Sequence, residues 1–590
     1  LVQLLHKEPM RHPSLLRVSG KDVSLVLCGA AGQGVQTVEE LLVKAIRHLG
    51  YSVFASREYM SRVRGGNNST EIRFSPWPVR AFVDRIDVLV PLNEGIRENV
   101  RRRISSQTLI IGDRNVFHTE GEELGGRYFN VEFLKIASEI GGVVFANFVA
   151  AGMLLGMVGG GLEIGYSFCG EKFAPKGQLI VDKNKEALDR GFKIGQTLTE
   201  GTLPFICGDS KGRPLHRSVL SGTEALSLGA LAGGCTFIAA YPMSPATGVL
   251  SFMAQCASQL GVVVEQTEDE LAAINMALGA GYAGARAMVT TSGGGFDLMT
   301  EGVSLAGIME VPVVIHVGQR PGPATGMATR TEQGDLHAAL YGGHGEFPRA
   351  VFAPATLEEA VRIGAKSFYI AEKYHIPVII LTDQYFLNSY YDMTIPDLES
   401  LSFPSMIVES EKDYCRYKFS SNGISPRSVP GNGKGLIGAD SHEHDEESHV
   451  YEDFDLRKCM VDKRFRKLAL MRCEAEEPLF VGAQDYRILI IGWGSTFHIL
   501  EEALEFIGHS QVALMHFQQL YPLPASLGER LEQAQNIIVV EGNKTGQFAH
   551  LLRQETGRKV DSIITNYNGL QFSVEQVVRE LAACLNEGVY

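Results

Sequence analysis

The chain has 590 residues, of which 45% are hydrophobic and 21% are charged, and its formal net charge is −14. This length and ordinary composition predict about three or four globular domains, and the acidic balance argues against sequence-independent nucleic-acid binding, which needs clustered Lys and Arg. No apolar run reaches the roughly 18 residues of a membrane span, and residues 1–19 carry no signal-peptide pattern, so we expect a cytoplasmic protein with no membrane span.

The first β/α-rich block is expected at residues 20–198. An apolar run at residues 23–28 precedes a glycine-rich turn that contains Gly32 and Gly34, and a helical pattern follows at residues 35–49. This order predicts a strand, a tight turn and a helix. The turn could cradle a phosphate on helix N–H groups, or it could simply let the helix pack closely on the strand.

Further along this block, strand-like runs lie at residues 88–91 and 109–112. Three arginines, Arg57, Arg62 and Arg64, lie beside a second flexible turn. Arginine binds phosphate through bidentate hydrogen bonds, but a solvated or subunit-facing charge cluster would explain these residues as well.

A linker that contains several Pro and Gly residues is expected at residues 199–218, and a second block at residues 219–400. Apolar runs in this block predict strands at residues 236–241, 287–291, 311–317 and 377–382. A helical pattern at residues 268–283 separates the first two of these strands. Such alternation of strands and helices is typical of a parallel α/β sheet.

Residues 401–477 break this rhythm and are interpreted as a long excursion or linker, with a basic helical piece at residues 457–472. A third block is expected at residues 478–590. Strand-like runs at residues 487–491 and 536–540 restart the β/α pattern there.

Two segments of the second block carry residues suited to chemistry. Tyr241-Pro242-Met243-Ser244-Pro245 lies where a predicted strand ends, and its two prolines make a stiff loop that presents the Ser244 hydroxyl. Glu268-Asp269-Glu270 then precedes a helix of small apolar residues. Acids at a helix start are ordinarily favourable charges on the helix dipole. A helix this apolar should be buried, however, so an acid at its mouth could be buried too and have a function.

These motifs resemble those of the 2-oxoacid:ferredoxin oxidoreductases. Residues 241–245 are similar to that family's Tyr-Pro-Ile-Thr-Pro loop, residues 290–296 to its Thr-Ser-Gly-Pro-Gly loop, and residues 319–326 to its Gln-Arg-Gly-Gly-Pro-Ser-Thr-Gly segment. The resemblance covers nearly the whole chain and looks most like a fused γ/α subunit of the 2-oxoglutarate type. It implies an α/β protein with a γ domain, a thiamine-diphosphate pyrimidine-type domain with a parallel sheet, and a transketolase C-terminal-like domain.

The resemblance also implies roles for individual residues. Glu268 aligns with the glutamate that hydrogen-bonds N1′ of the cofactor's aminopyrimidine, and Arg320 with the arginine that binds the substrate's 1-carboxylate. Ser244 replaces the family's threonine and keeps its hydroxyl, and Thr325 and Thr329 are further candidates for the same pocket. Further cofactor contacts are expected from Tyr241, Pro242, Ser292 and Gly293, and contacts to coenzyme A from Gly32, Gly34, Arg62 and Arg64. A helix-capping acid and a salt-bridging arginine are the alternatives for Glu268 and Arg320.

The resemblance further implies a partner. The nine cysteines include no Cys-x-x-Cys pair, and no Gly-Asp-Gly with a downstream Asn provides a site for Mg²⁺ and diphosphate. In this family those parts belong to a β subunit, so thiamine diphosphate would be shared with a β subunit that holds Mg²⁺ and a [4Fe–4S] cluster. We expect an (αβ)₂ assembly that passes electrons to ferredoxin and the acyl group to coenzyme A.

The substrate is left open by the sequence. His442, His444 and His449 lie among acids in a stretch that resembles the Glu-His-Asp-Glu segment of 2-oxoglutarate enzymes, although such a run is more often solvated charge than a metal site. This favours 2-oxoglutarate, with pyruvate and branched-chain or aryl 2-oxoacids such as indolepyruvate as alternatives. Met243, Gly294 and Pro321 depart from the family's motifs near the expected pocket, and the direction, oxidation or CO₂ fixation, is open.

Two other classes of function compete with this interpretation. One is a non-catalytic scaffold subunit that kept the fold, which would not need Glu268, Arg320 and a hydroxyl at Ser244. The other is a nucleotide-binding module in residues 1–200. Because fold resemblance alone does not establish a reaction, these site residues carry the distinction.

Overall fold

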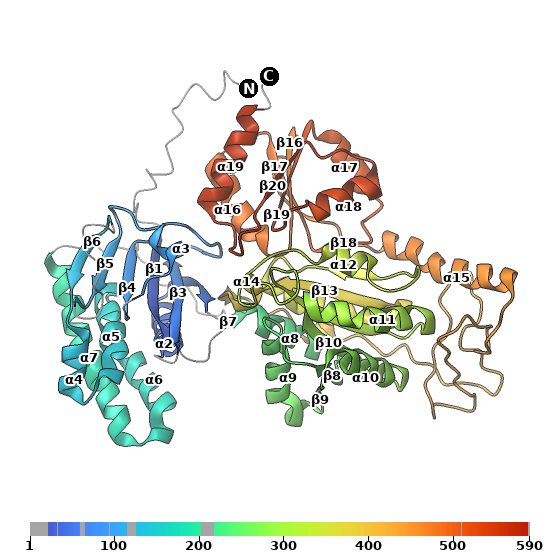
Figure 1. The fold of residues 1–590 in the computed structure, drawn as a ribbon, viewed down its shortest axis with the longest axis horizontal. Coiled ribbons are helices and arrows are strands. Elements are labelled where there is room, and N and C mark those ends of the chain that lie inside the picture. The colour runs from blue at the N-terminus through green and yellow to red at the C-terminus, as the bar shows by residue number, and fades with distance from the viewer. Residues whose placement is uncertain are drawn as a thin grey trace.

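A computed structural model describes residues 22–31, 34–59, 65–93, 95–114, 125–201, 218–508 and 510–587. Within these ranges the strands gather into three sheets that are covered by helices. Figure 1 shows the first sheet with its helices at one side of the molecule, the second sheet beside it, and the third above the second. The α/β architecture predicted from the sequence is confirmed.

The first sheet has the order β6-β5-β4-β1-β3-β2-β14-β7. These strands are β1 (Val23–Ala31), β2 (Ser52–Glu58), β3 (Gly65–Ser75), β4 (Val88–Pro91), β5 (Leu109–Gly112), β6 (Arg127–Asn130), β7 (Ser218–Ser221) and β14 (Tyr390–Met393). Helices α2 (Val35–His48), α3 (Glu98–Arg101), α4 (Phe133–Ile140), α5 (Ala146–Val158), α6 (Glu163–Phe173) and α7 (Gln178–Gly201) belong to the same block. The expected strands at residues 88–91 and 109–112 are found at those positions.

Two strands of this sheet come from the second block of the chain. β14 pairs antiparallel with β2, with Tyr390 opposite Ala55, and β7 pairs with the other edge of β14. Asp392 fastens the join, because its Oδ1 accepts hydrogen bonds from the Ser52 hydroxyl at 2.5 Å and from the Val53 N–H at 2.9 Å. Strand pairing therefore crosses the boundary that the sequence led us to place at residues 199–218.

The second sheet has the order β18-β12-β13-β11-β10-β8-β9, and its strands from β12 to β9 are parallel. The strands are β8 (Phe237–Ala240), β9 (Val263–Gln266), β10 (Ala287–Ser292), β11 (Val313–Gln319), β12 (Ala350–Phe352), β13 (Pro377–Asp383) and β18 (Gln519–Tyr521). The flanking helices are α8 (Gly222–Ala232), α9 (Thr247–Leu260), α10 (Glu270–Tyr282), α11 (Gly293–Met309), α12 (Leu336–Tyr341), α13 (Leu357–Tyr374) and α14 (Gln384–Asn388). Parallel strands bring their carboxyl ends to one edge, where ligands of such sheets bind.

The third sheet has the order β15-β17-β16-β19-β20. Its strands are β15 (Leu479–Gly482), β16 (Ile488–Trp493), β17 (Val512–Phe517), β19 (Asn536–Glu541) and β20 (Ser562–Thr565), and its helices are α16 (Phe497–Ile507), α17 (Leu527–Gln533), α18 (Gln547–Thr556) and α19 (Val574–Glu587). This part of the chain also contributes β18, which pairs with β12, so the second and third blocks share a sheet as well. Two hydrophobic clusters contain residues of both blocks.

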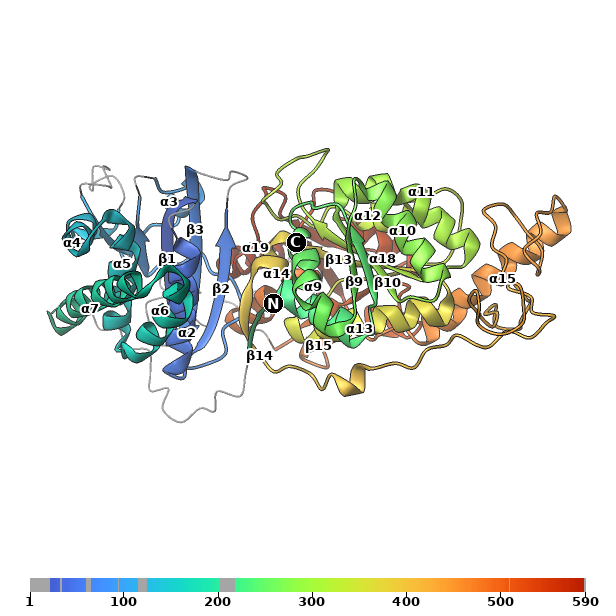
Figure 2. The ribbon, with the colours of Figure 1, turned by 90° about the horizontal axis from the view of Figure 1, so that it is seen from below.

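The excursion expected at residues 401–477 contains irregular chain followed by helix α15 (Phe454–Cys473). Figure 2 shows α15 at the end of the molecule opposite the first sheet. Its Lys463 and Lys467 are almost fully buried and both donate to the carboxylate of Glu310, which caps the far end of α11; the Lys463 bond measures 2.6 Å. The excursion is therefore fastened to a helix whose other end lies at the candidate site.

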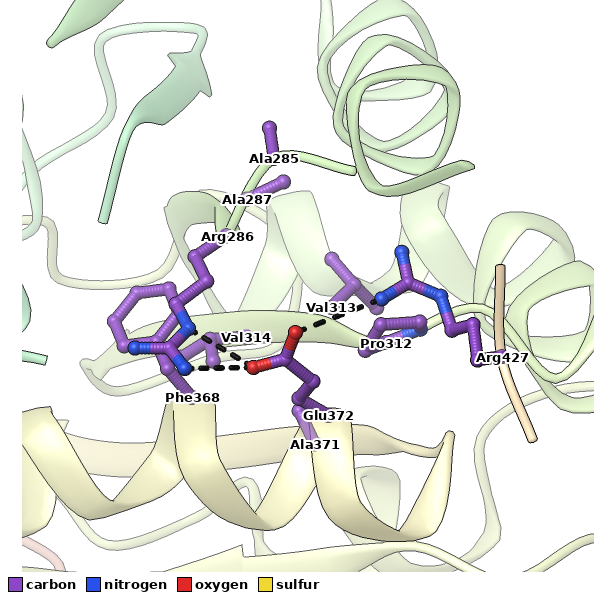
Figure 3. A pocket seen from close by; sticks show the side chains of 10 residues that line it. All are labelled: Ala285, Arg286, Ala287, Pro312, Val313, Val314, Phe368, Ala371, Glu372 and Arg427. Carbon is purple, nitrogen blue, oxygen red and sulfur yellow. Dashed lines mark hydrogen bonds and ion pairs between the residues drawn. The ribbon is translucent and has the colours of Figure 1, made fainter. Parts of the chain in front are cut away.

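A second ion cluster fastens the excursion at the amino ends of β10 and β11 (Figure 3). Arg286 donates to Glu372 Oε2 at 2.7 Å, and Arg427 of the excursion approaches the other carboxylate oxygen at 3.8 Å. The cavity among these side chains has a volume of about 10 Å³. Such a space holds about one water molecule, so we interpret the cluster as structural.

Replacing Glu310 by Gln should test how much the first ion cluster contributes to stability. The change would leave two buried lysines without a counter-charge, and breaking a buried pair in this way costs ~3–5 kcal/mol. Urea denaturation of the purified protein would measure the loss. As a control, Glu171→Gln removes an exposed partner of Lys44 and should change the free energy of unfolding by less than about 1 kcal/mol. Equal effects of the two variants would contradict this assignment.

Candidate functional site

The motifs singled out in the second block meet at the carboxyl edge of the second sheet. The loop after β8 and the loop after β11 are joined by Arg320, whose Nη1 donates to the carbonyl oxygen of Ser244 at 2.6 Å. The end of β10 joins them, because the Ser292 hydroxyl lies 2.6 Å from the sulfur of Met243. The structure therefore brings three of the four recognised motifs together around one place.

The fourth motif, the acidic triplet, also reaches this place, but through a different residue from the one expected. Asp269 is the N-cap of α10, and its Oδ1 accepts from the Ala272 N–H at 2.7 Å. Glu268 therefore precedes the helix and is exposed, whereas Glu270 is its first residue and is 2% exposed. The burial that we expected of Glu268 was wrong, and it is found two residues later.

Glu270 lies against the first turn of α11. Its Oε1 is 3.5 Å from the Thr291 hydroxyl. A Cβ atom at Gly295 would come within 2.6 Å of the same carboxylate oxygen and would overlap the Thr291 hydroxyl. Residue 295 therefore has to be glycine for the Glu270 carboxylate to reach this position. This requirement explains one glycine of the glycine-rich motif at residues 290–296.

A second carboxyl group, which the sequence analysis did not single out, lies on the same turn. A Cβ atom at Gly293 would overlap both carboxylate oxygens of Asp335. Burial raises the pKa of Asp335 to about 7, an effect that Asp297 and Glu332 increase and Arg320 opposes. The sequence shows only that Asp335 lies in the segment that follows Arg320, which does not indicate its burial.

Arg320 has hydrogen-bonding capacity to spare. Beyond its bond to Ser244, its Nε is buried and has no hydrogen-bond partner among the described residues. Burial lowers the pKa of Arg320, and the negative charges of Asp335 and Glu270 oppose this lowering. A half-buried guanidinium with a free donor at a sheet edge is suited to binding a carboxylate.

The remaining expected site residues lie at differing depths. Thr329 and Ser292 are buried, Ser244 and Pro242 are half-buried, and Thr325 and Tyr241 are exposed. Gly293 is buried at the start of α11. Because Tyr241 and Thr325 lie at the rim of the site, their predicted contacts would require a ligand or a partner surface there.

The third block holds the segment that carries Arg320 and Asp335. Gln333 accepts from the Gly542 N–H at 2.8 Å and donates to the Trp493 carbonyl at 2.8 Å. Asn543 donates to the carbonyl of Gln333, and Gln547 to that of Gly334 at 2.8 Å. The Glu-Gly-Asn sequence at residues 541–543 therefore positions the site from outside the second block.

Comparison with known proteins identifies the family. The family model "Pyruvate ferredoxin/flavodoxin oxidoreductase" matches residues 24–194, and "Pyruvate flavodoxin/ferredoxin oxidoreductase, thiamine diP-bdg" matches residues 228–463. The alpha subunit of 2-oxoacid:ferredoxin oxidoreductase 2 from Aeropyrum pernix is 31% identical over 93% of this chain and 95% of its own length. This chain belongs to the 2-oxoacid:ferredoxin oxidoreductase family, as an alpha subunit.

Relatives of this alpha subunit include 2-oxoglutarate enzymes. The 2-oxoglutarate oxidoreductase subunit KorA of Mycobacterium tuberculosis is 28% identical over 96% of this chain and 92% of its own length. A solved structure of 2-oxoglutarate:ferredoxin oxidoreductase from Magnetococcus marinus, with 2-oxoglutarate, coenzyme A and succinyl-CoA bound, matches with a TM-score of 0.89 at 29% identity. It covers 95% of this chain and 99% of that chain.

The first block of the alpha subunit contains a separate cavity of about 320 Å³ beside the start of α2. Gly34, Arg57, Glu58 and Thr70 are among the residues that line it. Arg57 is held by an ion pair to Glu39 at 2.8 Å, so it is not a free phosphate ligand. Gly32, Arg62 and Arg64 lie outside the described residues, and their expected contacts stay predictions.

A buried ion pair connects this cavity with the candidate site. Glu58 lies at the end of β2, and Arg330 of the loop after β11 donates to its Oε2 at 3.1 Å. Asn99 donates to both oxygens of the same carboxylate. The loop that carries Arg320 is thus in contact with the lining of the first cavity.

The acidic and His-rich stretch forms ordinary structural contacts. His442 and His449 pair with neighbouring aspartates, and the His444 ring packs on Tyr417 with ring centroids 3.8 Å apart. Among the described residues, no group of three His, Cys, Asp or Glu side chains could hold a metal ion. In the same part of the chain, no helix has both the length and the apolar character to cross a membrane.

Two glycine substitutions on α11 should distinguish an effect on the position of the Glu270 carboxylate from a general effect on the helix. Gly295→Ala should displace the Glu270 carboxylate and lower turnover by about 10²-fold, because a misplacement of about 1 Å within a site can cost that much. Gly294→Ala is the matched control, because a Cβ atom there meets its nearest neighbour, the Ala324 carbonyl, only at 3.5 Å. Turnover and thermal unfolding would be measured for both, and equal turnover in the two variants would contradict the role given to Gly295.

Proposed function

We propose that this alpha subunit catalyses, with a β subunit, the thiamine-diphosphate-dependent oxidative decarboxylation of a 2-oxoacid to its acyl-CoA. The observation that carries the proposal is the placing of the buried Glu270 carboxyl and the partly unpaired Arg320 guanidinium at one sheet edge. A carboxyl group there can exchange a proton with a cofactor, and the guanidinium can bind the substrate's carboxylate.

The residues at this edge fit the aminopyrimidine end of thiamine diphosphate. Glu270 offers a buried carboxyl, and the exposed Tyr241 and half-buried Pro242 offer apolar surface in the loop after β8. When bound, thiamine diphosphate supplies an electron sink for decarboxylation. We assign to Glu270 the proton-holding role toward N1′ that the sequence suggested for Glu268, because Glu268 is exposed.

Arg320 would bind the 1-carboxylate of the substrate. Its bond to the Ser244 carbonyl fixes one edge of the guanidinium, and the rest of this half-buried group would face the ligand. Lysine would not reproduce this, because a single ammonium cannot hold the loop and the ligand in one plane. Ser244, Thr325 and Thr329 are proposed to complete the same pocket.

Membership of the family supports a partner subunit and an electron path. The relatives are alpha subunits, which implies a second subunit. We propose that a β subunit holds the diphosphate, Mg²⁺ and a [4Fe–4S] cluster, in an (αβ)₂ assembly that reduces ferredoxin in the cytoplasm. Coenzyme A is proposed to bind at the cavity beside Gly34, and support comes from the coenzyme A in the Magnetococcus marinus enzyme.

The proposed substrate is 2-oxoglutarate, with succinyl-CoA and CO₂ as products. Support comes from KorA subunits among the relatives and from the 2-oxoglutarate bound to the Magnetococcus marinus enzyme. Pyruvate and aryl or branched-chain 2-oxoacids such as indolepyruvate are the alternatives within the family. The domain limits given from the sequence, and the direction of the reaction, remain proposals.

The substrate assignment is tested by reconstituting the alpha subunit with its co-purifying partner. Ferredoxin reduction and acyl-CoA formation would be measured with 2-oxoglutarate, pyruvate and indolepyruvate under identical conditions. We expect the highest kcat/KM with 2-oxoglutarate. Equal or higher values with another acid would overturn the 2-oxoglutarate assignment, and turnover of none of the acids would overturn the proposed function.

Replacing Glu270 by Gln should separate this enzyme from a scaffold. Removal of the acidic proton should lower turnover by about 10²-fold or more, while the fold persists because the two side chains have nearly the same shape. Glu268→Gln is the matched control, two residues away and exposed, and should keep most of the activity. Unchanged turnover in the Glu270 variant would favour the scaffold, and loss in the Glu268 variant alone would restore the original assignment.

A further inference from the structure

Asp335 is a carboxyl group at the site that the proposed function does not use. It lies just before α12, and its backbone N–H donates to Gln319 at 3.0 Å, which places it beside the end of β11. Its Oδ2 is buried and has no hydrogen-bond partner among the described residues. An enclosed carboxylate oxygen without a partner is costly, because it has lost its hydration and gained no bond in return.

The charges around Asp335 come from helix α11 and from the loop after β11. Asp297 of α11 and Glu332 of the loop after β11 are acidic, and Arg320 at the end of β11 is the neighbouring cation. Arg320 and Asp335 interact through space but form no ion pair in the described structure, and Arg320 keeps its own unpartnered Nε. The carboxyl group of Asp335 and the guanidinium of Arg320 therefore face one site, and each keeps an atom without a hydrogen-bond partner among the described residues.

A substrate carboxylate at Arg320 would change this balance. It would add a negative charge close to Asp335 and would take up the guanidinium that now offsets the charge of Asp335. Both effects favour the neutral form of a neighbouring acid. The carboxylate of Asp335 cannot move closer to α11 to avoid the added charge, because it already lies where a Cβ atom on Gly293 would be.

We propose that Asp335 is a positioning residue of the oxoacid site, which takes one proton from solvent when the substrate's carboxylate binds Arg320. In this step the carboxylate of Asp335 becomes a carboxylic acid, and no other bond is made or broken. Neutral Asp335 leaves Arg320 entirely to the substrate and gains an O–H that can donate a hydrogen bond. The inference rests on the proposed function, because it takes Arg320 as the partner of the carboxylate.

The sign of the expected pH dependence follows from linkage. Below about pH 6 most of the free enzyme would already carry the proton, and above the free pKa of about 7 substrate binding would have to take it up. The kcat/KM for the oxoacid should therefore be level at low pH. It should fall by about tenfold per pH unit above neutrality, because kcat/KM reports the ionisation of the free enzyme. The 2-oxoacid itself stays fully ionised over this range.

Asp335→Asn in the reconstituted holoenzyme tests the proposal. The amide imitates the protonated acid, so the fall above neutrality should disappear, and kcat/KM at about pH 8.5 should exceed that of the unmodified enzyme by about thirtyfold. A merely structural role would give a loss at every pH and no gain. Asp297→Asn is the matched control on an exposed position of α11, and its profile should keep the fall, displaced to slightly lower pH.

Each outcome has a separate meaning. A fall that persists unchanged in the Asp335 variant, or a loss of kcat/KM at every pH, would overturn the role of Asp335 while the enzyme still converts its oxoacid. Absence of turnover in the unmodified holoenzyme with any 2-oxoacid and coenzyme A would instead remove the proposed function. The two failures are therefore distinguishable in one set of measurements.

Discussion

The close approach of two carboxyl groups to the first turn of α11 is the constraint on which the site depends. Glu270 and Asp335 come from different elements, and each lies where a side chain on Gly295 or Gly293 would otherwise be. The helix start favours negative charge, since its first N–H groups have no partners within the helix. Two acids can therefore lie in a poorly hydrated place beside Arg320 without one of them being expelled into solvent.

The rest of the molecule keeps this turn in position. The parallel strands of the second sheet bring the loops to one edge, and the third block holds the segment of Asp335 through Gln333 and Asn543. At the far end of α11, Glu310 is fastened by two lysines of α15. The long excursion, which has little regular structure before α15, is thus a support for the same helix that carries the site.

Much of the fold could be predicted from the sequence, because buried parallel strands read as short apolar runs between helical patterns. The strand at residues 88–91 and the α/β alternation of the second block are examples. The pairing of β14 and β7 with the first sheet could not be predicted. It joins residues that lie hundreds of positions apart, and no local pattern in either strand specifies its partner.

The burial expected at Glu268 is found at Glu270 instead, and this shift has a physical cause. Three consecutive acids precede α10, and the sequence does not show which of them caps the helix. Asp269 takes the cap, which turns Glu268 toward solvent and Glu270 toward the sheet. Asp335 was missed because its environment is made by Gly293, forty-two positions earlier, and burial by a distant segment leaves no trace in the local pattern.

The sheet that the first and second blocks share has a consequence for folding during translation. β2 is translated long before its partner β14, which begins only at Tyr390. Until that segment leaves the ribosome, one edge of the first sheet stays open, with backbone N–H and C=O groups that have no strand to pair with. Contacts of such long range are slow to form. The first sheet of the nascent chain therefore stays incomplete until the whole segment between β2 and β14 has been synthesised.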